Sequence, residues 1–165
     1  MCFSPINSFP NKVAETKDDM NKIKALMARN DFYYFDNIKL GWKSMKDNDT
    51  IWVLHYHFHT LIGFSCYKYD KTNKTKYNGS KERDYMWLLY LLIDKDYQNC
   101  GYGTTIMNSY KTLATLKKMW VLIIDLDRTK DNYYKLIDYY TKLGFELDNN
   151  GKPDGYGQII MRCRL

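Results

Sequence analysis

The chain has 165 residues, the usual size of one domain and enough to bury a hydrophobic core. Hydrophobic residues make up 45% and charged residues 27%, a balance that excludes an intrinsically disordered chain. The net charge is +6, but the lysines are spread along the chain, which predicts a solvated basic surface rather than direct nucleic-acid binding. A polyanionic ligand would benefit from the same charge.

No window approaches the ~20 uncharged apolar residues of a membrane span, and the first residues lack the charged and apolar blocks of a signal peptide. The four cysteines are scattered without metal-ligand spacing, which favours reduced thiols. We therefore predict a cytoplasmic or nuclear protein with no membrane partner and no bound metal. The sequence leaves a homodimer open.

The first part of the chain has a helical pattern. Apolar residues at helical spacing predict a helix over residues 12–29, and an aromatic-rich segment predicts a second helix over 31–46. The period then changes, and residues 51–54 and 61–64 read as two strands joined tightly through Phe58–Thr60.

Residues 85–93 form the most apolar run, which predicts a central strand buried on both faces. Beyond a loop that contains glycines, residues 106–114 predict an amphipathic helix, and 120–124 predict another buried strand. A second helical stripe over 133–140 is ended by Gly144, a residue typical of helix C-termini.

Residues 145–147 and 156–163 complete the pattern as a strand pair across a turn over 151–155. This order predicts an α/β fold, a mixed and mostly antiparallel sheet flanked by helices, within a single domain over residues 1–165.

The segment Gln98–Thr104 lies between the central strand and the helix that follows it. In this position successive backbone N–H groups and the positive end of the helix dipole can hold a phosphate. Glycine at 101 and 103 removes the Cβ atoms that would keep a pyrophosphate from the backbone. No Gly-Lys-Ser/Thr and no GxGxxG follows, which excludes the Walker and Rossmann loops. From the glycines alone, an ordinary tight turn stays open.

Two motifs together resemble the GNAT superfamily of N-acetyltransferases. One is Gln-x-x-Gly-x-Gly after an apolar strand, and the other is Tyr-x-x-x-Gly-Phe on a later helix. Their residues here are Gln98, Gly101, Gly103, Tyr140, Gly144 and Phe145. The resemblance is good from about Leu88 to Phe145, within a predicted cofactor-binding core over about 84–147. The loop looks closest to the histone acetyltransferase branch.

The resemblance implies an acetyl-CoA-dependent N-acetyltransferase that moves an acetyl group to a primary amine by direct transfer in a ternary complex. The sequence does not distinguish among the possible acceptors, which are a small-molecule amine, a protein lysine and a protein N-terminus. The cofactor-binding residues that the resemblance implies are Leu91, Leu92, Ile93, Gln98, Asn99, Cys100, Gly101, Tyr102, Gly103, Thr104 and Asn132. Asn132 reads equally well as a helix cap.

Tyr140 matches the family tyrosine near the CoA sulfur, where its phenol would assist the leaving thiolate, although it could equally be a core aromatic. The histone acetyltransferase branch carries a glutamate base where this chain has Trp87. Tyr85, Asp84 and His57 are the nearest substitutes, and deprotonation through water is the route we favour. The missing glutamate supports an alternative function, a catalytically weak CoA-binding sensor or interaction module.

His55, His57 and His59 alternate and on one strand would share a face, which is metal-ligand geometry in principle. A turn at residues 58–60 would break that alignment, so no metal site is predicted.

Overall fold

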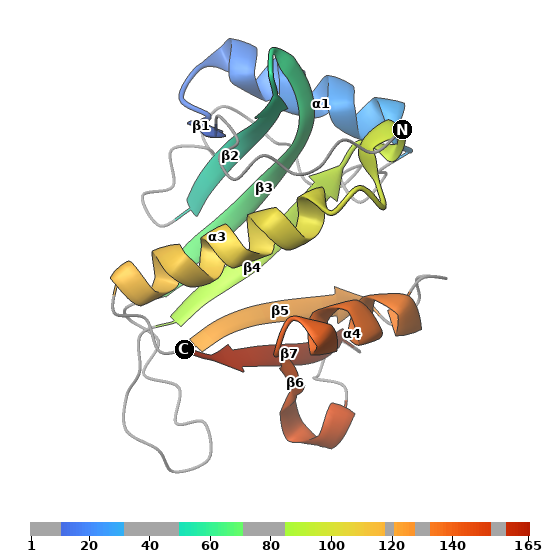
Figure 1. Ribbon diagram of the computed structural model, residues 1–165. Helices are drawn as coiled ribbons and strands as arrows, with labels where there is room; N and C mark the ends of the chain where they lie inside the picture. The colour runs from blue at the N-terminus through green and yellow to red at the C-terminus, as the bar shows by residue number, and fades with distance from the viewer. Residues whose placement is uncertain (1–10, 32–49, 71–84, 118–120, 128–132, 153–157) are drawn as a thin grey trace. The chain divides into compact units, whose positions relative to one another are not determined.

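The computed structural model describes residues 11–31, 50–70, 85–117, 121–127, 133–152 and 158–165 (Figure 1). The chain divides into two compact units. The first consists of Met1–Lys68 and Tyr90–Ile106, and the second of Tyr69–Leu89 and Met107–Leu165. Strands β3 and β4 and helix α3 contribute residues to both units.

The strands of the first unit are hydrogen-bonded in the order β1-β2-β3-β4. Their bounds are Asn11–Val13 for β1, Thr50–His57 for β2, Thr60–Asp70 for β3 and Tyr85–Ile93 for β4. Strand β2 pairs antiparallel with β1 and β3, and its register against β3 slips between His55 and Tyr56. The hairpin is longer than predicted, but its turn, at Phe58 and His59, lies where the sequence placed it.

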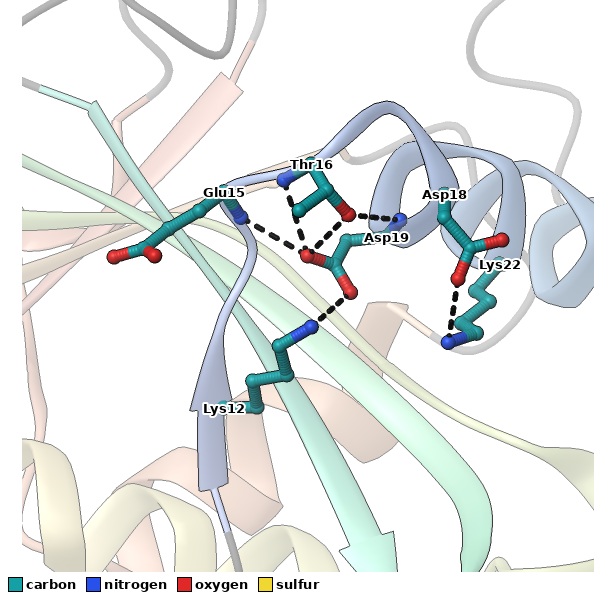
Figure 2. Close-up of polar contacts among 6 residues, drawn as sticks. All are labelled: Lys12, Glu15, Thr16, Asp18, Asp19 and Lys22. Carbon is teal, nitrogen blue, oxygen red and sulfur yellow. Dashed lines mark hydrogen bonds and ion pairs between the residues drawn. The ribbon is translucent and has the colours of Figure 1, made fainter.

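Helix α1 spans Lys17–Arg29 and begins at a capping box (Figure 2). Thr16 Oγ1 accepts a hydrogen bond from Asp19 N, and the Asp19 carboxylate accepts one from Thr16 N, each at 3.1 Å. The buried carboxylate also accepts from Lys12 Nζ at 2.6 Å and Glu15 N at 3.1 Å. Burial by itself raises the pKa of Asp19, but the hydrogen bonds outweigh it and hold that pKa well below its ordinary value.

The predicted helix start at residue 12 is wrong. Residues 11–13 form β1, with Lys12 opposite Leu54, and helical geometry begins only after the Thr16 cap. The predicted second helix lies, apart from Asp31, outside the described residues. One face of α1 packs on the sheet in a core whose buried members are Ala14, Met20, Ile23, Leu26, Met27, Trp52, Leu54, Phe64, Cys66 and Leu92.

The strands of the second unit are ordered β4-β5-β7-β6. The additional strands are β5 (Val121–Asp127), β6 (Glu146–Leu147) and β7 (Gln158–Arg164). Strands β4 and β5 run parallel, and β7 is antiparallel to both β5 and β6. Helix α4 spans Tyr133–Lys142, and Gly144 follows with φ +84°, as its predicted place after a helix requires. Lys111 Nζ donates to the Leu143 carbonyl at this helix end.

Helix α3 spans Tyr102–Leu116 (Figure 1). Two short 3-10 turns, η1 (Lys95–Tyr97) and η2 (Asp148–Gly151), complete the described elements. The predicted fold class, a mixed and mostly antiparallel sheet with helices, is confirmed. One domain over the whole chain stays a prediction. No helix in the described ranges is long and apolar enough to span a membrane.

The expected burial of β4 on both faces is wrong. Met86 and Leu88 are buried, but Leu89 is 40% exposed and Leu91 is partly exposed. Successive side chains of a strand point to opposite faces, so one face of β4 is covered less completely than the other.

Candidate active site

The predicted phosphate loop connects the end of β4 to the start of α3 within the first unit. Its backbone has positive φ at two alternate positions, +60° at Asn99 and +82° at Gly101. Alternation of left-handed and right-handed residues turns successive N–H groups toward one concave side, which suits an anion. A Cβ added at Gly101 would meet no atom within 4 Å, so open space lies beside the backbone there.

The first turn of α3 adds further donors. Thr105 N donates to the Gly101 carbonyl at 3.1 Å, which is the start of the helical ladder. The backbone amides of residues 102–104 precede that bond, and the N–H groups of a first helical turn point out of the helix N-terminus. Together with the left-handed residues of the loop, these donors fit a pyrophosphate.

Gln98 has a different role from its neighbours. Its Nε2 donates to the Ile93 carbonyl at 2.9 Å, so the side chain closes the loop onto the end of β4. Cys100 is disulfide-bonded, whereas Cys66 and Cys163 are free and buried. The expectation that all four cysteines are reduced thiols is therefore wrong at Cys100.

The residues predicted to hold the pantetheine arm are the last of β4. Parallel pairing of β4 with β5 runs from Tyr85 to Leu88, and within the described chain it does not reach Leu91, Leu92 or Ile93. On the β3 side a Cβ added at Gly63 would lie 2.5 Å from the Leu92 carbonyl oxygen. A side chain at residue 63 would therefore collide with the backbone of β4, and glycine avoids this collision.

Sequence reasoning missed the charged groups that support this end of β4. Asp94, fully buried, directly follows β4, and its backbone N–H donates to the Ile62 carbonyl at 2.8 Å. Arg29 Nη2, at the end of α1, lies 2.8 Å from Asp94 Oδ2 and 2.7 Å from Asp96 Oδ2. Asp94 Oδ2 has no aligned hydrogen-bond donor among the described residues, so its contact with Arg29 is an ion pair. Lys95 N also donates to Asn30 Oδ1 at 2.7 Å.

The histidines separate into different environments. The His55 ring is buried between Asn11 Oδ1 at 2.8 Å and Ser65 Oγ at 2.6 Å, and burial lowers its pKa to about 4. His57 is partly buried, with Nδ1 3.2 Å from the Tyr102 hydroxyl. No group of three or more potential metal-binding side chains occurs in the part of the chain that the structure describes.

Tyr140 belongs to α4 in the second unit and is 6% exposed. Burial, with a smaller contribution from Tyr139, raises its pKa far above neutral, so the phenol keeps its proton. Its ring makes an edge contact with Phe145 at 5.7 Å between centroids. Tyr140 is thus a buried core aromatic with a protonated phenol, and its role beside the CoA sulfur stays a prediction.

Of three other predicted site residues, the structure describes only the backbone of one. Tyr85 is the first residue of β4, opposite Val121, but its side chain lies outside the described part of the chain. Asp84 and Asn132 also lie outside the described residues.

A sequence model of the family described as "Acetyltransferase (GNAT) domain" matches residues 47–147. The match covers more than half of the chain, so the chain belongs to the GNAT acetyltransferase family. The predicted resemblance is confirmed, and with it an acyltransferase class that uses acetyl-CoA as the acetyl donor. No curated protein matches this chain.

Solved structures share the fold at low sequence identity. A GNAT-family protein from Desulfovibrio desulfuricans has a TM-score of 0.70 at 12% identity, over 96% of this chain and 98% of its own. The PaiA N-acetyltransferase from Thermoplasma acidophilum, solved with coenzyme A, has a TM-score of 0.64 at 15% identity, over 94% of this chain and 99% of its own. The ribosomal-protein-S18-alanine N-acetyltransferase from Escherichia coli has a TM-score of 0.63 at 16% identity, over 93% of both chains.

Proposed function

We propose that this protein is an N-acetyltransferase that moves the acetyl group of acetyl-CoA directly to a primary amine in a ternary complex. The observation that carries the proposal is the loop over residues 98–104. It combines two left-handed residues with the amides of a helix N-terminus, inside the segment that matches the GNAT family. That arrangement suits the pyrophosphate of CoA.

Each part of the site has a chemical task in this proposal. Bound acetyl-CoA supplies an activated thioester. The backbone of Leu91–Ile93 would pair with the pantetheine arm, and the amides of residues 99–104 would hold the phosphates. Asn132, which precedes α4 in the sequence, would contact the pantetheine.

The neutral amine forms the new N–C bond as the C–S bond breaks, and the nitrogen then releases one proton, which restores the phenol of Tyr140 after it has protonated the thiolate. Tyr140 would then donate its phenolic proton to the leaving thiolate, or hydrogen-bond it. Burial raises the pKa of this phenol, so it stays protonated in the neutral range and is better suited to a hydrogen bond with the thiolate than to full proton transfer.

The amine must lose a proton before it attacks, because an amine with a pKa near ~10 is almost wholly protonated at neutral pH. Trp87 cannot accept it, since an indole N–H only donates. We propose that water carries this proton away. Tyr85, Asp84 and His57 are the alternative protein bases, and replacing each in turn tests whether any of them takes the proton. His57 Nδ1 already faces the Tyr102 hydroxyl at 3.2 Å, which favours the water route over a histidine base.

The decisive assay measures release of free CoA thiol from acetyl-CoA with a panel of polyamines, amino sugars, lysine peptides and N-terminal peptides. We expect one class of amine to raise thiol release well above the rate without acceptor, with acetyl-amine as the product by mass spectrometry. Binding of acetyl-CoA without turnover on any amine would contradict the enzyme and support a CoA-binding sensor or interaction module. Absence of any thermal stabilisation by millimolar acetyl-CoA would contradict both functions.

The acceptor and the cellular setting belong to the same proposal. The related solved structures include acetyltransferases named for acceptors as different as an aminoglycoside and the alanine of a ribosomal protein. The amine panel therefore has to cover small molecules and proteins. We propose a cytoplasmic or nuclear location, and a homodimer remains to be tested by light scattering.

A further inference from the structure

Tyr102 is the first residue of α3, inside the loop proposed to hold the phosphates. Its side chain is 3% exposed, and its hydroxyl lies 3.2 Å from Nδ1 of His57. The two rings meet edge to face with centroids 5.6 Å apart, and the ring of Tyr97 packs against Tyr102 at 6.1 Å. The residue that starts the helix is thus held by its side chain as well as by the backbone.

The β2–β3 hairpin holds His57 in place for this contact. It is the last residue of β2 and lies opposite Thr60 of β3 in the hairpin register. The next residue, Phe58, turns the chain with φ +53°. A side chain on the last paired residue of a strand has little freedom to follow a moving loop, so the His57–Tyr102 contact limits where α3 can begin.

The contact does not depend on the protonation state of the histidine. A phenol both donates and accepts hydrogen bonds, so Tyr102 can donate to neutral His57 or accept from the imidazolium. Burial, together with the nearby Tyr97, raises the pKa of Tyr102, so the phenol itself stays neutral.

We propose that the His57–Tyr102 pair positions the loop for the pyrophosphate of CoA, with both side chains acting as positioning residues rather than as groups that touch the acetyl centre. This inference rests on the proposed function. The backbone amides at 101–104 can converge on one phosphate only while the start of α3 keeps its place. The hydrogen bond holds that place before the ligand arrives, so less ordering is required on binding.

The test compares Tyr102→Phe with Tyr97→Phe. Each variant loses one phenolic oxygen from the same aromatic cluster, but only Tyr102 is hydrogen-bonded to His57 among the described contacts. Two donors are used, acetyl-CoA and S-acetylpantetheine, which carries the thioester without any phosphate.

We expect Tyr102→Phe to weaken acetyl-CoA binding by about 5-fold, the effect of one neutral hydrogen bond. Its kcat/KM should fall more with acetyl-CoA than with S-acetylpantetheine. Tyr97→Phe should match the wild type with both donors. His57→Phe should repeat the effect of Tyr102→Phe, and the double variant should add nothing further.

Equal losses with both donors would overturn the inference, because a general disturbance of the fold does not distinguish a donor with phosphates from one without. Unchanged acetyl-CoA affinity in both Tyr102→Phe and His57→Phe would overturn it as well, while leaving the proposed function intact. A wild-type protein that binds no acetyl-CoA would instead defeat the proposed function, and this inference with it.

Discussion

Tyr140 combines a buried ring with a hydroxyl that keeps its proton across the neutral range. If that proton assists the leaving thiolate, the interaction strengthens as charge builds on sulfur, and its loss lowers kcat more than binding. We expect Tyr140→Phe to lower kcat by roughly 100-fold with little change in the Kd for acetyl-CoA. Steady-state thiol release and calorimetry measure the two quantities.

A control for this substitution lies on the same helix. Tyr134 is 78% exposed, so Tyr134→Phe removes a phenol oxygen of α4 without touching the buried face. It should leave both kcat and Kd unchanged. A Tyr140→Phe variant with wild-type kcat would assign Tyr140 to packing alone.

His55 provides a pH-dependent stability term. Its pKa is about 4 in the folded protein against an ordinary 6.5, because burial disfavours the imidazolium. Between these values the unfolded chain binds a proton that the folded protein does not, so stability falls as the pH falls from 6.5 to 4. The free energy of unfolding should fall by about 3 kcal/mol across this pH range, as measured by urea unfolding.

His55→Gln is the matched variant, since its amide can still donate and accept but does not titrate. In this variant the free energy of unfolding should change less steeply with pH between 6.5 and 4. Asp19 acts in a separate window, because its lowered pKa contributes stability that is present above its ordinary value of 3.8 and is lost only at lower pH. A wild-type protein with constant stability from pH 6.5 to 4 would contradict the burial of a neutral His55.

At the scale of elements, the loop between β4 and α3 depends on the left-handed backbone of Gly101. An added Cβ there meets no neighbouring atom, so the effect of alanine is conformational, roughly 1–2 kcal/mol. We expect Gly101→Ala to weaken acetyl-CoA binding about 10-fold or more, because the loop amides turn away from the phosphate. Calorimetry with acetyl-CoA measures this loss.

Gly151 is the control for backbone strain, with φ +70° in η2 of the second unit. Gly151→Ala should cost a similar amount of stability in urea unfolding without affecting acetyl-CoA binding. Equal affinities in the two alanine variants would show that the loop does not hold the cofactor.

The whole molecule carries a net charge of +6, and acetyl-CoA is a polyanion. A field spread over many lysines raises the local concentration of the ligand and is screened by salt. Raising sodium chloride from about 0.05 M to about 0.5 M should therefore weaken acetyl-CoA binding by roughly 10-fold. S-acetylpantetheine, which has no phosphates, should show no such change. An acetyl-CoA affinity that does not depend on salt would contradict a role for the net charge.

The sequence alone determined the features that depend on neighbouring residues. The apolar run predicted β4, Gly101 marked the turn into α3, and the stripe before Gly144 predicted α4, because strand, turn and helix signals are local. The motifs at Gln98 and Tyr140 also identified the family. A local signal was missed where Thr16 and Asp19 form the capping box, and the helix was therefore started too early.

Only the tertiary structure decided which distant residues meet. The pairing of Arg29 with the buried Asp94 and the contact of His57 with Tyr102 join elements far apart in the chain. No spacing rule encodes such contacts, since they arise when hydrophobic packing closes long loops. The pKa directions of His55 and Tyr140 were hidden for the same reason, because burial is a property of the folded chain rather than of the residue.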